Sequence, residues 1–134
     1  MLLAPCKVEF LKGGYVKLLA DVPFLIRGVR ITAHAGYVWN MASIPKFLRG
    51  IVGCPSDLIG ESLLHDLIYE SGIYPRETAD LYLYLILRSG GQYKDEVDKL
   101  RAKAIYAGVR TCGAPYYKSG NVSAAREFVS IELI

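Results

Sequence analysis

A change of hydrophobic period near Pro45 constrains the fold of this chain more than any other feature of its sequence. Before this residue, β-branched and aromatic residues form short runs broken by turn residues, as in strands. After it, apolar residues recur every three or four positions in three segments, as in amphipathic helices. We therefore expect an α+β fold in which a small N-terminal antiparallel sheet is followed by three helices and a short C-terminal strand.

Turn residues set the bounds of the expected strands. Lys12-Gly13-Gly14 separates the first two and predicts a hairpin, because glycine adopts a positive φ without a steric penalty. Phe128 to Ile134 alternates apolar and polar residues and predicts the C-terminal strand. The N-terminal strands are expected at Lys7 to Leu11, Tyr15 to Leu19, Phe24 to Arg27, Val29 to Ala33 and Tyr37 to Trp39.

Cap residues set the bounds of the expected helices. Gly72 is a typical stop for the first helix, and Pro75 suits the first turn of the second. Gly113 to Asn121 is expected to be a loop that carries exposed tyrosines. The helices are expected from Ser56 or Asp57 to Ser71, from Pro75 to Arg88 and from Lys94 to Arg110.

The length and composition indicate one domain over residues 1–134. A chain of 134 residues can bury a core without a metal or disulfides. No run approaches the roughly 20 apolar residues that span a bilayer, and the first residues lack the pattern of a secretory signal. The three cysteines lie far apart in the sequence and predict free thiols in a reducing compartment. We expect a cytoplasmic protein.

The charges give no strong signal for a nucleic-acid partner. The net charge of +3 arises from 16 basic and 13 acidic residues that are spread along the chain. The local basic excess around the third predicted helix is interpreted as a solvated helix face; it comprises Lys94, Lys99, Arg101, Lys103 and Arg110.

Candidate chemistry centres on His65, in the middle of the first predicted helix. Glu61 precedes it by four residues and Tyr69 follows it by four, so the three side chains share one helix face. Histidine moves protons near neutral pH, and a neighbouring carboxylate or phenol would fix its tautomer. Asp66 points about 100 degrees away around the helix axis and could bind a cation. The alternative is a partly buried histidine that Glu61 or the backbone satisfies.

Asp80 lies in the second predicted helix, within an otherwise apolar stretch. The short connection after Ser71 should fold this helix back on the first, which can bring Asp80 within hydrogen-bonding range of His65 or Tyr69. A His-Asp arrangement of this kind can activate water. The same packing can instead leave Asp80 at the surface or pair it with Arg76, and these outcomes stay open.

Asn40 and Ser43 belong to the connection between the sheet and the helices. They can cap backbone groups in a turn, or they can present polar groups to the pocket of His65. Ser43 lacks the Gly-x-Ser-x-Gly setting of a hydrolase nucleophile. His34 has no partner at ligand spacing and is interpreted as structural.

An ordered set of motifs resembles a known family. The segment Gly36-Tyr37-x-x-Asn40-x-Ala42-Ser43-x-Pro45, then Leu64-His65-Asp66-x-x-Tyr69 and Arg76-Glu77-x-Ala79-Asp80, is similar to a family of short phage and prophage proteins known as a domain of unknown function. The resemblance implies a phage origin, with the protein in the host cytoplasm or the virion. That family usually has aspartate where this chain has Asn40, so the resemblance assigns no acidic role there.

The His-Asp-x-x-Tyr motif also resembles the active-site helix of phospholipase A₂. That likeness implies that His65 is the general base for a water and that Asp80 orients it, with Tyr69 as a supporting hydrogen-bond donor. It further implies that Asp66 binds a divalent cation such as calcium. The disulfides of that family are absent, and Gly50-Ile51-Val52-Gly53 is only a loose counterpart of its calcium loop.

Two functions follow from these observations. The first is a phage-encoded hydrolase in which His65 and Asp80 activate water for attack on a lipid or another ester. The second is a non-enzymatic virion, assembly or host-interaction protein in which the same residues hold two helices together. In that case Tyr116, Tyr117 and the C-terminal strand would supply surface for a phage or host protein, or for a second copy of the chain.

Overall fold

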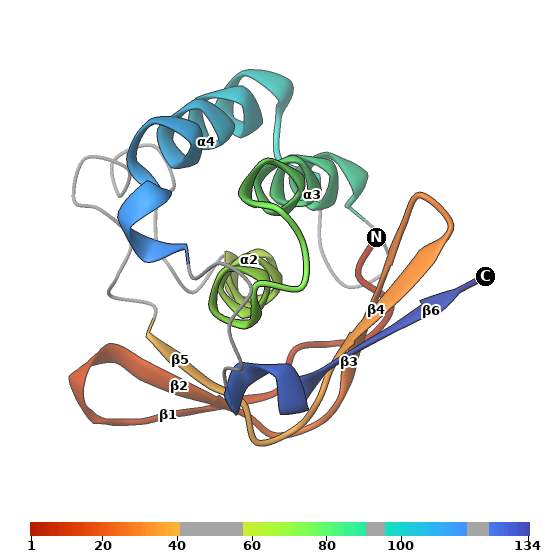
Figure 1. The fold of residues 1–134 in the computed structure, drawn as a ribbon, viewed down its shortest axis with the longest axis vertical. Helices are drawn as coiled ribbons and strands as arrows, with labels where there is room; N and C mark the ends of the chain where they lie inside the picture. Colours follow the sequence, from red (N-terminus) through yellow and green to blue (C-terminus); the bar gives the residue numbers. More distant parts are fainter. Residues whose placement is uncertain (41–57, 91–95, 118–123) are drawn as a thin grey trace.

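The strands of this protein lie on one side of its helices (Figure 1). The computed structural model describes residues 1–40, 58–90, 96–117 and 124–134. In this part of the chain, N-terminal antiparallel strands are followed by three α-helices and a C-terminal strand, which confirms the predicted α+β class. The strands divide into two three-stranded sheets, and the C-terminal strand belongs to the second of them.

The first sheet has the order β1-β2-β5 and is antiparallel throughout. Its strands are β1 (Val8–Phe10), β2 (Tyr15–Leu18) and β5 (Val38–Asn40). The β1–β2 turn contains Gly13 with a φ of 75°, so the glycine pair makes the hairpin that the sequence predicts.

The second sheet has the order β3-β4-β6, and it joins distant parts of the chain. Its strands are β3 (Val22–Ile26), β4 (Val29–Ala33) and β6 (Val129–Leu133). Arg27 and Gly28 both have positive φ, at 49° and 76°, as a two-residue type I′ hairpin turn requires. β6 pairs with β4, although all of the described α-helices lie between these two strands in the sequence.

The described part of the chain contains the α-helices α2 (Ile59–Ser71), α3 (Arg76–Ser89) and α4 (Lys99–Cys112). α2 ends as predicted, since Gly72 is left-handed and its N–H donates to the carbonyl of Ile68. The predicted start of α2 at Ser56 or Asp57 lies outside the described residues. α4 begins later than the predicted Lys94, because the Asp98 carboxylate accepts a 3.0 Å hydrogen bond from the N–H of Arg101 and caps the helix.

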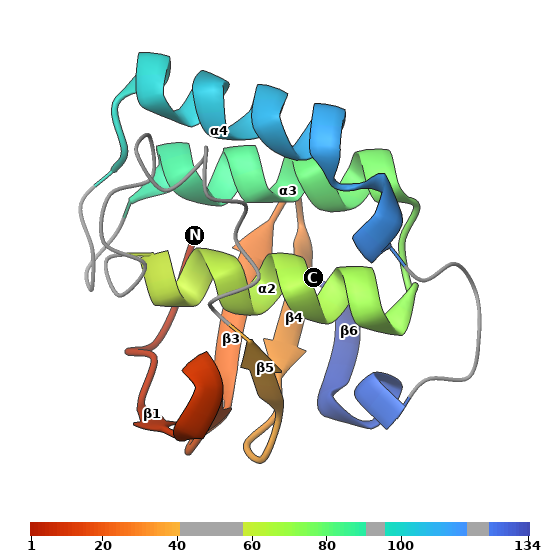
Figure 2. The same cartoon turned by 90° about the vertical axis from the view of Figure 1, so that its left-hand side faces the viewer.

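The helices stack in layers above the strands, with α2 nearest to them and α4 farthest away (Figure 2). Leu63, Leu64, Leu67 and Ile68 of α2 are buried, and they belong to one core with buried side chains of both sheets. A second cluster joins α3 and α4; it comprises Leu58, Leu83, Leu87, Val97, Ala102 and Ile105. Among the described residues, no helix is long and apolar enough to cross a membrane.

Candidate functional site

The candidate site is built around Asp80, whose side chain is fully buried in α3. α2 packs against α3 and brings two side chains to the same carboxylate oxygen, Oδ1. His65 Nε2 lies 2.8 Å from it, and the Tyr69 hydroxyl donates to it at 2.6 Å. Of the outcomes that the sequence left open for Asp80, hydrogen bonding to His65 or Tyr69 is therefore the one observed, and it is observed for both residues.

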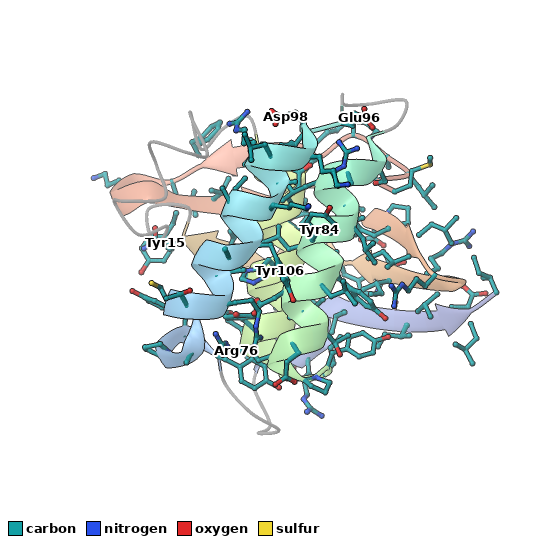
Figure 3. The ribbon with its side chains drawn as sticks, turned by 90° about the horizontal axis from the view of Figure 1, so that it is seen from above. Tyr15, Arg76, Tyr84, Glu96, Asp98 and Tyr106 are labelled. Atoms are coloured by element: carbon teal, nitrogen blue, oxygen red, sulfur yellow. The ribbon has the colours of Figure 1, made fainter. Side chains whose placement is uncertain are left out.

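Two arginines lie near Oδ2, the other carboxylate oxygen of Asp80, and connect it to α4. Arg110 of α4 donates from Nη1 to Oδ2 at 2.8 Å, and Arg76 Nε lies 4.0 Å from the same oxygen. Arg76 also donates to the carbonyls of Val109 and Arg110, beside the end of α4 (Figure 3). Asp80 thus links α2, α3 and α4 through one carboxylate.

The environment of Asp80 favours its ionised form. Burial alone would raise its pKa, but the hydrogen bonds from His65 and Tyr69, the charge of His65 and the hydrogen bond from Arg110 together lower that pKa below its ordinary value. Burial, followed by the hydrogen bond and charge of Asp80, raises the pKa of Tyr69, so Tyr69 stays a hydroxyl donor. The carboxylate also raises the pKa of Arg110.

The ring of His65 has a defined orientation. It lies against the ring of Tyr69, with centroids 4.1 Å apart, and its side chain is 12% exposed. Because an ionised carboxylate only accepts, the neutral ring carries its proton on Nε2 and has its lone pair on Nδ1. Nδ1 is therefore the ring nitrogen that can accept a proton.

Asp66 belongs to a separate acidic group on the neighbouring face of α2. Burial, followed by the nearby charge of Glu70, raises the pKa of Asp66 to about 8. Burial and the same two carboxylates raise the pKa of Tyr37, a buried residue that stacks on Trp39. Among the described residues, no group of three His, Cys, Asp or Glu side chains is placed to hold a metal.

Of the remaining predicted site residues, those that the structure describes are not part of the Asp80 network. Asn40 ends β5 opposite Tyr15, and none of the hydrogen bonds to Asp80 involves it. Ser43 and Gly50-Ile51-Val52-Gly53 lie outside the described residues. His34 contacts Asp21 and Ser130 by hydrogen bonds of 3.1 and 2.8 Å near the second sheet.

Two predictions from the sequence are corrected at this site. Arg110 does not lie on a purely solvated helix face, because its guanidinium binds the buried Asp80. No spacing rule could have found it, since 30 residues separate the two side chains. Tyr117 is not an exposed loop residue either, because its half-buried side chain donates to the carbonyl of Tyr74 at 2.7 Å; Tyr116 is 54% exposed.

Comparison with known proteins gives one match. A family model described as a protein of unknown function, DUF1353, matches residues 16–109, which include His65, Tyr69 and Asp80. Arg110 and β6 follow the matched segment. No curated protein matches the chain, and no solved structure does.

Proposed function

The chain belongs to the DUF1353 family of proteins of unknown function, and we propose that it is a phage-encoded hydrolase in which His65 is the general base. One observation carries this proposal: Asp80 binds His65 through Nε2, which fixes the tautomer and leaves the lone pair of the neutral ring on Nδ1, the nitrogen that can accept a proton. The hydrogen bond from Tyr69 to the same oxygen holds the carboxylate in position. The phage origin rests on the motif resemblance alone.

The proposed reaction is ester hydrolysis. Nδ1 of His65 removes a proton from a water while the water oxygen attacks the ester carbonyl, and Asp80 stabilises the imidazolium that forms. The tetrahedral intermediate then expels the alkoxide, which takes the proton back from His65. A lipid ester or another ester would serve as the substrate, and the products are an acid and an alcohol.

A calcium ion at Asp66 is not needed for these proton transfers. The phospholipase likeness implies such an ion, and calcium requires six to eight oxygen ligands. The described residues offer Asp66 and Glu70 on one face of α2, which do not make such a set. No step of the proposed reaction is therefore assigned to a cation.

A second function is favoured by the completeness of the Asp80 network. His65, Tyr69 and Arg110 all bind the carboxylate, and a satisfied buried network of this kind fixes the relative positions of helices. In this proposal the protein is a non-enzymatic virion, assembly or host-interaction protein. Its motif is structural, and it acts in the virion or the host cytoplasm.

Kinetics of His65→Gln distinguishes the two proposals, because glutamine keeps a donor for Asp80 but cannot act as a base near neutral pH. The matched control is His34→Gln, which changes the other histidine, whose partners are Asp21 and Ser130. Aryl esters of increasing acyl length and phospholipid vesicles serve as substrates. We expect His65→Gln to lower kcat/KM by about 10² to 10⁴ while the control stays near wild type.

The outcome for the wild-type protein decides between the functions. Hydrolysis of any substrate that is lost in His65→Gln and kept in His34→Gln supports the hydrolase. If the wild-type protein hydrolyses none of them while His65→Gln lowers the midpoint of urea unfolding, the hydrolase proposal fails and the structural role is supported.

A further inference from the structure

Within the described residues, β6 is an edge strand of the second sheet. At the opposite edge, residues near the N-terminus cover β3: the N–H of Leu3 donates to the carbonyl of Pro23, and the N–H of Leu25 donates to the carbonyl of Met1. β6 pairs with β4 on one side, and no strand in the described residues pairs with its other side. Open edges are usually blocked by charges, proline or a covering segment.

The register shows which backbone groups β6 leaves unpaired. The N–H of Ile134 donates to the carbonyl of Gly28, and the N–H of His34 donates to the carbonyl of Phe128. Because hydrogen-bonded positions alternate along an antiparallel pair, the even-numbered residues of β6 face β4. Val129, Ile131 and Leu133 therefore direct their N–H and C=O groups to the open edge.

The side chains of the same three residues form an apolar row in which Val129 is partly buried against the core, whereas Ile131 and Leu133 are exposed. Ile131 lies opposite Ile31, which lies opposite Phe24, so this row continues the core face of the sheet. Ile31 and Phe24 are fully buried, whereas Ile131 is 44% exposed and Leu133 is 82% exposed. Figure 1 shows β6 running out from beneath the helices towards the C-terminus.

We propose that this edge binds a second copy of the chain, β6 against β6, to give one six-stranded sheet across a two-fold axis at Ile131. In that register Ile131 lies opposite the partner's Ile131, and Val129 lies opposite the partner's Leu133. Every outward N–H of β6 then meets an outward C=O of the other copy, and the two apolar rows join. The proposal does not depend on the proposed function.

The negative charge of Glu132 favours this register over its alternatives. Each Glu132 lies opposite the partner's Ser130, and each Glu132 keeps its own Arg30 at 3.8 Å. A two-fold axis at Glu132 would place two carboxylates directly opposite, which is destabilising. An axis at Ser130 would leave Leu133 opposite the partner's Glu127, before the start of β6, and would shorten the strand overlap. The axis at Ile131 alone pairs all five residues of β6.

The test is a matched pair of charge variants at Ser130. In the proposed dimer, Ser130→Lys places a cation opposite the partner's Glu132, and Ser130→Glu places a carboxylate there. Both variants lose the hydrogen bond to His34, so that loss cancels between them. Sedimentation equilibrium at low ionic strength should give a dimer Kd about tenfold lower for Ser130→Lys than for Ser130→Glu, and added salt should narrow the gap.

Amide hydrogen exchange is a second measurement, and it identifies the strand edge at which the two copies pair. As protein concentration rises, the N–H groups of Val129, Ile131 and Leu133 should become protected, whereas those of Ser130 and Glu132 are protected at every concentration by β4. A monomer at all soluble concentrations would overturn the proposal. A dimer in which Ser130→Lys and Ser130→Glu have equal Kd, or whose new protection lies outside β6, would overturn it as well.

Discussion

A Cβ built on Gly113 would lie 2.5 Å from the hydroxyl oxygen of Tyr69 and 2.5 Å from the carbonyl oxygen of Val109, so both α2 and the last turn of α4 leave room only for a glycine. The same hydroxyl donates to Asp80 at 2.6 Å. The backbone of Gly113 has a φ of −81°, which any residue adopts, so glycine is required here for space. Gly113 therefore helps to keep the Tyr69 hydroxyl on the carboxylate.

Gly113→Ala should lower the free energy of unfolding by about 1 to 3 kcal/mol, because the added methyl group must displace Tyr69 or the end of α4. Urea unfolding measures the change. Combining Gly113→Ala with Tyr69→Phe, which removes the hydroxyl, should cost less than the sum of the two single losses. Additive losses would show that the contact with the Val109 carbonyl, and not the one with the Tyr69 hydroxyl, accounts for the effect of the methyl group.

Asp80→Asn should destabilise the protein more than Tyr69→Phe. Asparagine removes the negative charge that His65, Tyr69 and Arg110 all bind, whereas the phenylalanine removes one hydrogen bond to a charged acceptor, at about 1.5 to 3 kcal/mol. Tyr116→Phe is the control, since Tyr116 is exposed and should change stability little. Equal midpoints for Asp80→Asn and wild type in urea would contradict a stabilising network.

Lowering the pH should abolish the difference in stability between the wild-type protein and Asp80→Asn. The folded-state pKa of Asp80 lies below its unfolded value, so its stabilisation is complete above the unfolded pKa of about 4 and is lost as pH falls through the folded pKa. Urea midpoints measured from pH 6 down to pH 2 should therefore converge for the two proteins. A constant difference over that range would contradict the lowered pKa.

Asp66 should give the opposite pH dependence. Its folded-state pKa is raised to about 8, so its contribution is complete below the unfolded pKa of about 4 and is lost as pH rises towards 8. At pH 9, Asp66→Asn should be more stable than wild type by about 1 kcal/mol or more. Glu70→Gln removes the neighbouring charge and should weaken the pH dependence of stability. An unchanged gap between pH 5 and pH 9 would refute this assignment.

The calcium role implied for Asp66 is tested by calorimetric titration of the wild-type protein and Asp66→Ala. Binding at Asp66 predicts a saturable heat change on addition of calcium to the wild type, and loss of that heat change in the variant. Asp21→Ala is the control, because Asp21 is an exposed aspartate whose partners are His34 and Ala35. If the wild type and Asp66→Ala give the same binding isotherm, calcium does not bind at Asp66.

The contact of Asp80 with His65 and Tyr69 could be foreseen as one of two outcomes, because the local rules bring the two helices together without fixing which side chains meet. Helical spacing places His65 and Tyr69 on one face, and a short connection folds α3 back on α2. Arg110 could not be predicted in the same way, since its position depends on how α4 packs against α3. Several packings satisfy the same apolar pattern, and only one brings this guanidinium to Asp80.

Among the strands, too, pairs joined by a short turn could be predicted, whereas pairs between segments far apart in the sequence could not. The hairpins of β1 with β2 and of β3 with β4 follow from turn residues next to the paired segments. The separation into two sheets depends on β5 pairing with β2 and on β6 pairing with β4, and no local signal specifies those partners. The start of α4 was missed for a different reason, because the basic and acidic residues before Asp98 resemble a first helical turn.

The pairing of β4 with β6 also has a consequence for synthesis of the chain. His34 and Ser130, which bond across this pair, are 96 residues apart, and all three helices are translated between them. While the ribosome makes the helices, the nascent β3–β4 hairpin therefore exposes one unpaired edge of β4. Sheet completion is a late event after translation of β6, and such long-range pairing is intrinsically slow. During that interval, the newly made chain is most vulnerable to aggregation at β4.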